Sequence, residues 1–157
     1  MQNPGYNTGN TIFSEGEWFP FKIHNLVQLQ DDAWYYVLQD INGLKHFMSA
    51  EYYESYGLII GTEITCKIDR INCTGRIFLE PKHPYYKEGE IYYFKVISFS
   101  NSDADKALIV QDISGNSIAV PVYNNANLEM NLENMVSCVV KRIKKGLPIL
   151  ELCSNNS

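Results

Sequence analysis

Hydrophobic and polar residues alternate along several short segments of the chain. In residues 63–71 the apolar set is Ile64, Cys66 and Ile68. Successive side chains of a strand point to opposite faces, so this period of two predicts a strand with one buried face. In residues 135–144 the matching inward set is Val136, Cys138 and Val140. The same pattern therefore occurs twice, far apart in the sequence.

The repetition extends over most of the chain. "EGEWFPFKI" (Glu15 to Ile23) matches "EGEIYYFKV" (Glu88 to Val96), and "LQDING" matches "VQDISG". "CKIDRI" and "CVVKRI" match in the same way, at a nearly constant offset of 71 to 73 residues. A fixed offset with small drift indicates a duplicated unit of about 70 residues whose loops differ by single residues.

Each unit contains the signals of five strands. The first strand is "FPFKI" or "YYFKV", and the second is "AWYYVLQD" or "KALIVQD", closed by Asn42-Gly43 or Ser114-Gly115. A short third strand follows each turn. The segment "SAEYYESYGL" then predicts a short helix that begins at Ser49 and ends at Gly57. The alternating fourth strand and a fifth strand complete the unit.

Three strands, a short helix and a final hairpin are the element order of an OB-type barrel. The sequence therefore predicts an all-β protein made of two tandem five-stranded OB-type barrels. We place the first barrel at residues 15–87 and the second at 88–154, with a flexible leader at 1–14 and a tail at 155–157.

Composition and charge narrow the possible functions. The formal net charge is −5, which argues against a broad duplex-binding face but not against a local basic groove. The 4 cysteines lack metal-ligand spacing, and the sequence has no glycine-rich phosphate loop. We expect a non-enzymatic protein without metal or cofactor. The absence of a secretory signal and of long apolar runs predicts a cytoplasmic location without membrane contact.

The first unit resembles the S1 family of RNA-binding OB domains. The matching stretches are Tyr36-Val37, "GLKHFMS" (Gly43 to Ser49) and "GTEITCKIDRINCTGRIFLE" (Gly61 to Glu80). Three departures occur: one extra residue lies between His46 and Ser49, a glycine beside the first aromatic is missing, and the final Leu-Ser is Leu-Glu. The second unit has Ile118 in place of the histidine. The resemblance implies an OB fold and RNA binding by the first barrel.

Six residues of the first unit are candidates for a nucleic-acid site. Trp34 matches Lys106 in the second unit, so we expect an exposed indole that stacks on a base or packs against another part of the chain. Tyr36 shares its face of the strand. Lys45 and His46 are candidates for phosphate and base-edge contacts, and Arg70 and Arg76 for phosphate contacts. For His46 and Arg70 a structural role is the alternative.

A second basic patch is predicted in the second unit. It consists of Lys141, Arg142, Lys144 and Lys145, which precede the turn at Gly146. Such a cluster suits a nucleic-acid backbone or an acidic partner, and it equally suits a solvated hairpin.

Two functions remain open from the sequence. The first is binding of single-stranded RNA through the first barrel. The second is a protein-interaction or scaffolding role, which the acidic charge, the many tyrosines and the second barrel's lack of S1-like residues favour. The charge around Trp34 discriminates between them, since a positive surrounding favours nucleic acid and a negative one favours a protein partner.

Overall fold

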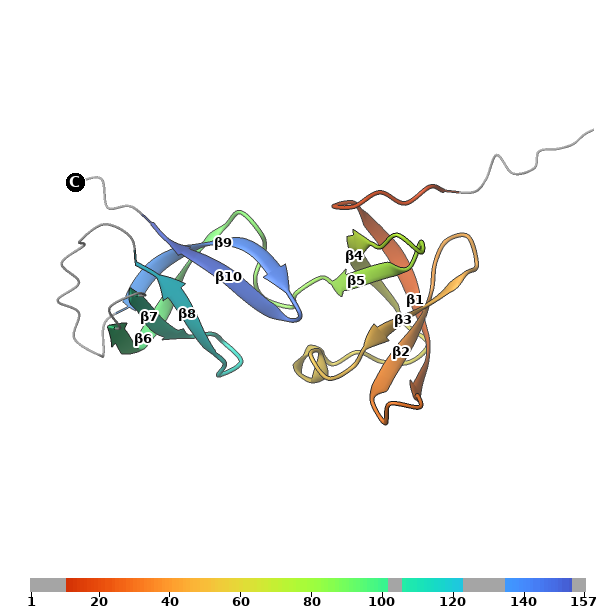
Figure 1. The fold of residues 1–157 in the computed structure, drawn as a ribbon, viewed down its shortest axis with the longest axis horizontal. Coiled ribbons are helices and arrows are strands. Elements are labelled where there is room, and N and C mark those ends of the chain that lie inside the picture. Colours follow the sequence, from red (N-terminus) through yellow and green to blue (C-terminus); the bar gives the residue numbers. More distant parts are fainter. Residues whose placement is uncertain (1–10, 102–105, 123–134, 154–157) are drawn as a thin grey trace, which may run out of the picture. The chain divides into compact units, whose positions relative to one another are not determined.

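The structure is a computed structural model that describes residues 11–101, 106–122 and 135–153 (Figure 1). The chain divides into two compact units, residues 1–82 and 83–157. The strands of the first unit are β1 (Trp18–Gln28), β2 (Trp34–Gln39), β3 (Lys45–Ser49), β4 (Glu63–Ile71) and β5 (Ile77–Pro81). They form one antiparallel sheet in the order β3-β2-β1-β4-β5. The outer strands β3 and β5 approach each other, so the sheet curls toward a barrel.

The second unit repeats this topology. Its strands are β6 (Ile91–Asn101), β7 (Lys106–Gln111), β8 (Ser117–Pro121), β9 (Met135–Lys144) and β10 (Leu147–Leu152). The sheet order is β10-β9-β6-β7-β8, with β8 and β10 in contact. The protein is therefore all-β, with two tandem five-stranded OB-type barrels, as the repeat predicts.

Each barrel has its own hydrophobic core. The inward residues of β4 and β9 predicted from the alternation are buried there, including Cys66, Ile68, Cys138 and Val140. Each core also contains a phenylalanine from its first strand, Phe21 or Phe94. Burial of such a side chain contributes about 1.5–3 kcal/mol, so each unit has a driving force of its own for folding.

The repeated Glu-Gly-Glu motif attaches the start of each unit to its fourth strand. The Glu15 carboxylate accepts a hydrogen bond from the backbone N–H of Ile71 (2.8 Å), and that of Glu88 accepts one from Ile143 (3.1 Å). Gly16 and Gly89 both have φ near +87° and donate their N–H groups to the fourth strand. The motif therefore recurs because each barrel needs the same tight entry turn.

The predicted helix is shorter than expected and begins later. Ser49 is the last residue of β3, and the segment contains one 3-10 turn, η2 (Glu54–Tyr56). Gly57 ends it in the left-handed conformation, as predicted. Tyr53 is drawn into the core, where its hydroxyl donates to Glu80 (3.0 Å), and this anchor restricts the segment to a short turn. Within the described ranges, no helix has the length and apolar character required to cross a membrane.

The edges of the units differ from those predicted. Residues 11–14, assigned to the leader, belong to the first barrel, because Phe13 packs edge-on against Phe19 (centroids 4.7 Å apart). The predicted boundary after residue 87 also shifts. Tyr86 lies in the core of the second barrel beside Phe94, so the division falls after Lys82. The remaining leader residues 1–10 and the tail 155–157 lie outside the described residues.

Candidate functional site

A groove crosses the face of the first barrel over β2 and β3. We call it the β2–β3 groove; its volume is about 520 Å³. It is lined by β2, β3, the first residue of β5, the loop between β1 and β2, and the loop between β4 and β5. Its lining residues are Leu29, Asp31, Tyr35, Lys45, His46, Phe47, Gly75, Arg76 and Ile77. OB folds bind oligonucleotides and oligosaccharides at this position, through strands 2 and 3 and the same two loops.

Two aromatic side chains stand in this groove. Tyr35 and Phe47 come from neighbouring strands and meet edge to face, with ring centroids 6.2 Å apart. Phe47 keeps 45% of its surface exposed. The Tyr35 hydroxyl donates to Asp31 (2.7 Å), and this hydrogen bond lowers the pKa of the Asp31 carboxyl and raises that of the phenol. The bond restrains the ring of Tyr35, which is partly buried in the groove.

Cationic side chains lie beside these rings. Lys45 is exposed on β3, and Arg76 reaches the groove from the β4–β5 loop. The guanidinium carbons of Arg70 and Arg76 lie 4.3 and 4.8 Å from the centroid of Phe78, so both cations pack on one ring. Arg70 does not line the groove itself, but it shares this ring with an arginine that does.

The second barrel lacks these groups at the matching positions. Its sheet register is the same, since Ile109 pairs with Ala119 as Val37 pairs with Phe47. Tyr35 and Phe47 are replaced by Ala107 and Ala119, and Lys45 by Ser117. The aromatic and cationic character of this face therefore belongs to the first barrel.

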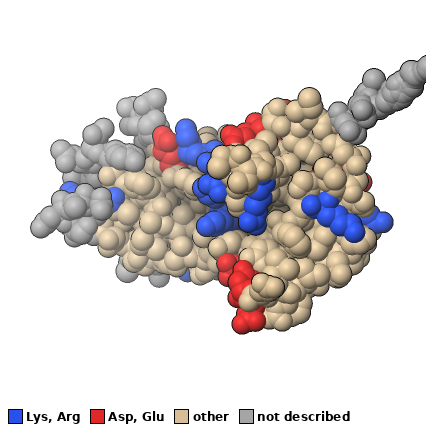
Figure 2. Space-filling model, turned by 45° about the vertical axis from the view of Figure 1, so that its right-hand side comes forward, with Lys and Arg blue, Asp and Glu red and all other residues tan. Residues whose placement is uncertain are grey.

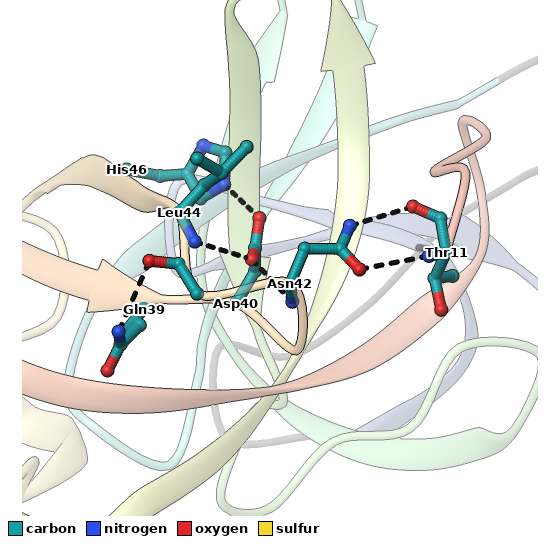
Figure 3. Close-up of polar contacts among 7 residues, drawn as sticks. Thr11, Gln39, Asp40, Asn42, Leu44 and His46 are labelled. Carbon is teal, nitrogen blue, oxygen red and sulfur yellow. Dashed lines mark hydrogen bonds and ion pairs between the residues drawn. The ribbon is translucent and has the colours of Figure 1, made fainter. Parts of the chain in front are cut away.

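His46 is held inside the barrel rim (Figure 3). Its Nε2 lies 2.7 Å from Oδ2 of Asp40, whose side chain is fully buried, while the histidine side chain is 15% exposed. Oδ1 of the same carboxylate accepts the backbone N–H groups of Asn42 and Leu44. His46 thus completes the hydrogen bonding of a buried carboxylate, which supports the structural alternative for this residue.

The second barrel satisfies its matching aspartate with a different side chain. Asp112 accepts two backbone N–H groups with Oδ1, as Asp40 does. Its Oδ2 accepts from the side-chain amide of Asn116 (3.0 Å), a residue that matches Leu44. Ile118 can therefore replace the histidine without leaving the aspartate without a partner. The turn is common to both units. A histidine in the first unit and an asparagine in the second bond the free oxygen of its aspartate.

Trp34 and Tyr36 line a different groove. They lie on the face of β2 that carries the core residue Leu38, whereas Tyr35 lies on the opposite face. We call this second site the Trp34 groove; its volume is also about 520 Å³. The structure therefore does not bring Trp34 and Tyr36 together with Lys45 and Arg76. Trp34 is 51% exposed, as its match to a lysine predicts, and Tyr36 packs partly against the core.

The chain has distant likenesses among solved structures. No protein-family model matches the chain, and no curated protein sequence matches it. Among solved structures, the crystal structure of the tetrameric p202 HIN2 is similar at 12% identity with a TM-score of 0.31, covering 92% of this chain and 95% of that one. A structure described as "Structural mimicry for functional antagonism" has 11% identity, a TM-score of 0.32 and coverage of 93% of both chains.

The charge around Trp34 is negative. The charged residues that line its groove are Asp32, Glu51 and Glu54. Figure 2 shows that, on the visible face, lysine and arginine side chains cover limited areas of a largely uncharged surface. By the criterion stated from the sequence, the surroundings of Trp34 favour a protein partner, whereas the β2–β3 groove retains the cationic character that suits nucleic acid.

The second basic patch is divided by the hairpin geometry. Lys141 lies 3.5 Å from the carboxylate of Glu151 on the neighbouring strand, and Arg142 is half-buried. Ile143 points into the core. Lys144 and Lys145 are exposed beside the turn, where Lys145 has a φ of +53°. The cations of residues 141–145 therefore lie in different surroundings and do not form one continuous row.

The described side chains include histidines, acidic residues and buried cysteines. Among them, no three His, Cys, Asp or Glu residues gather closely enough to hold a metal ion. Burial raises the pKa of the Cys66 thiol, and it raises that of Cys138 to about 12. A thiol that stays protonated is a poor nucleophile, so these cysteines act as core residues.

Sequence reasoning missed Tyr35 and Phe47. β2 begins with three consecutive aromatic residues, so composition cannot tell which face of the strand binds a ligand. The signal that distinguishes them is the repeat itself. Both residues become alanine in the second unit, whereas Tyr36 becomes the buried Leu108. A residue replaced by alanine in a barrel of the same fold is a better candidate for binding than one replaced by a core leucine.

Proposed function

We propose that the first barrel binds single-stranded RNA in the β2–β3 groove. The observation that carries the proposal is the combination of Tyr35 and Phe47 with Lys45 and Arg76 along one OB binding face. Stacking on aromatic rings and charge contacts with the backbone are the two components of single-strand binding by OB folds. RNA is chosen over DNA because of the S1 resemblance of residues 36–80.

The residues have separate roles in this proposal. Tyr35 and Phe47 stack on two unpaired bases, and Phe47 contributes the more exposed ring. Lys45 and Arg76 contact phosphates on either side, and Arg70 adds positive potential through its position on Phe78. His46 holds Lys45 and Phe47 in place through its bond to Asp40. The groove binds its ligand without chemical reaction, so the chain acts as a binding module.

A single strand fits this surface better than a duplex. Affinity for duplexes comes mainly from many phosphate contacts on a broad basic face. The chain has 13 lysines and arginines against 18 acidic residues, and two of these cations line the groove. Unpaired bases offer their faces to Tyr35 and Phe47, which base pairing in a duplex would conceal.

The test is fluorescence anisotropy of labelled ten-nucleotide RNAs of mixed sequence at low salt. Tyr35→Ala or Phe47→Ala is expected to weaken binding by about 1–3 kcal/mol each, because each removes one stacking platform. Lys45→Gln or Arg76→Gln is expected to reduce the salt slope by about 0.7 each, because each removes one phosphate contact.

The control is Tyr93→Ala, which removes a more exposed tyrosine from a strand of the second barrel (74% exposed). We expect it to leave RNA affinity unchanged. Absence of binding by the unmodified chain at low salt would refute the proposal. Equal losses in the Tyr93 and Tyr35 variants would show that the β2–β3 groove is not the site.

A further inference from the structure

The Trp34 groove is a second concave surface on the first barrel, separate from the proposed RNA site. Its floor is apolar and aromatic, with Leu26 from β1 and Trp34 and Tyr36 from β2. Its wall is the segment that follows β3, including Ala50 and Glu54. The two grooves share no lining residue. They are lined by residues from opposite faces of β2. The two grooves can therefore hold different ligands at the same time.

The charge of the Trp34 groove has one sign. Asp32, Glu51 and Glu54 line it, and none of its lining residues is a lysine or arginine. Within the described part of the chain, none of these carboxylates forms an ion pair with a lysine or arginine. Three carboxylates around an indole repel phosphate and attract a cation.

An indole face beside carboxylates is a suitable site for a guanidinium group. Arginine stacks on aromatic faces by cation–π attraction while its N–H groups remain free to bond carboxylates. Trp34 is half exposed and available for this contact. The second barrel has Lys106 at the matching position, a residue that would repel the same ligand. The aromatic and acidic combination is thus specific to the first barrel.

We propose that the Trp34 groove binds an arginine-containing segment of a partner protein. The guanidinium lies on the Trp34 ring, and Glu51 and Glu54 accept its hydrogen bonds. Leu26 and Tyr36 contact the aliphatic part of the segment. The site is independent of the proposed RNA groove, so a chain that fails to bind RNA can still bind the peptide.

The probe is a capped peptide, acetyl-Gly-Arg-Gly-Arg-Gly-amide, with glutamine in place of both arginines as the neutral comparison. The chain has 2 tryptophans, so Trp18→Phe leaves Trp34 as the fluorescent reporter. We expect a saturable change in Trp34 emission with the arginine peptide and binding at least about fivefold weaker with the glutamine peptide. Equal affinity of the two peptides would overturn the proposal.

A matched pair of charge variants locates the site. The double variant Glu51→Gln, Glu54→Gln is expected to bind the arginine peptide about fivefold more weakly or worse, because each substitution removes a charge-assisted hydrogen bond. Glu17→Gln with Glu63→Gln removes two exposed carboxylates of the same barrel outside the groove, and we expect little change. Equal weakening by both pairs would mean general charge attraction and refute the site.

Two further measurements exclude other occupants. A ten-nucleotide RNA added without peptide should not change Trp34 emission, and a saturable change would assign the groove to nucleic acid. Sedimentation of the full chain without peptide tests occupation by a second copy. Self-association that Trp34→Ala abolishes would overturn the proposal in favour of a homo-oligomer contact.

Discussion

At the scale of single residues, the molecule separates side chains that hold the fold from those that can bind a ligand. His46 looks like a ligand-binding residue in the sequence, but it satisfies the buried Asp40. His83 behaves similarly, since its Nδ1 accepts two backbone N–H groups within the second unit. Phe47, next to His46, has no such task and keeps an exposed ring. Histidines that satisfy buried or backbone groups are thus structural, whereas an exposed aromatic ring such as that of Phe47 is a candidate for binding.

The Asp40 turn can be tested by giving it the residues that satisfy Asp112 in the second barrel. His46→Ile is expected to destabilise the first barrel by about 1–3 kcal/mol, because Oδ2 of Asp40 loses its partner in a buried site. Adding Leu44→Asn should recover much of this loss, since Asn116 performs that role for Asp112. Urea unfolding followed by tryptophan fluorescence measures both effects. A double variant no more stable than His46→Ile would contradict this account of the turn.

His83 predicts a pH dependence of the second barrel. Burial lowers the pKa of its imidazole below the ordinary 6.5, and the charge of Asp112 opposes this shift more weakly. The unfolded chain therefore takes up a proton at higher pH than the folded one. The stability supplied by neutral His83 is complete above about pH 6.5 and decreases as the pH falls below that value.

The measurement is the rate at which the buried Cys138 thiol becomes accessible, compared between pH 5 and pH 7.5. His83→Gln keeps an acceptor for the backbone N–H groups of Tyr85 and Tyr86 but does not titrate. We expect this variant to show a smaller increase in opening at pH 5 than the unmodified chain. An identical pH dependence in both proteins would exclude His83 as its source.

At the scale of elements, the sequence predicts faces well where one strand face is apolar and the other polar. The alternation in β4 and β9 identifies their buried residues because the core accepts one set and water the other. β2 offers no such contrast, since Trp34, Tyr35 and Tyr36 are all aromatic. Its two faces are distinguished by Leu38, because the burial of this side chain assigns Trp34 and Tyr36 to the inward set. The helix prediction failed at its start because tertiary contacts of Tyr53 prevail over local capping signals.

The entry turns give an element-scale prediction. Gly16 has φ +87°, and a Cβ placed there would meet no atom within 4 Å. Gly16→Ala should therefore cost about 1–2 kcal/mol from backbone strain alone, without a steric clash. Gly16→Asn should cost less, because asparagine tolerates this conformation better. Urea midpoints of the two variants measure the difference. Equal costs would indicate that the side chain, not the backbone, is responsible.

At the scale of the whole molecule, each barrel has a separate core and a cysteine at its centre. Cys66 reports on the first barrel and Cys138 on the second, while Cys73 is exposed in the β4–β5 loop. We expect a thiol reagent to modify Cys73 at once in the native protein. Cys66 and Cys138 should react after opening of their own barrels.

A core variant tests whether the barrels open separately. Phe21→Ala should destabilise the first barrel by about 3–5 kcal/mol and accelerate modification of Cys66. Its counterpart Phe94→Ala should act on Cys138 in the same way. Mass spectrometry of digested samples resolves the two sites. Equal acceleration of both thiols by either variant would show that the units unfold together.

The matching Glu-Gly-Glu turns have a consequence for how the chain reaches its native state. β1 and β6 carry nearly interchangeable leading segments, and β4 and β9 offer them equivalent backbone partners. We expect that, in the unfolded chain, β1 competes for β9 and β6 for β4, and that such non-native pairs must dissociate before folding proceeds. The two cores differ, since Met48 lies in the first and valines such as Val96 and Val120 lie in the second, and this difference disfavours such hybrids. We therefore expect the divergence between the two copies to reduce non-native pairing during folding.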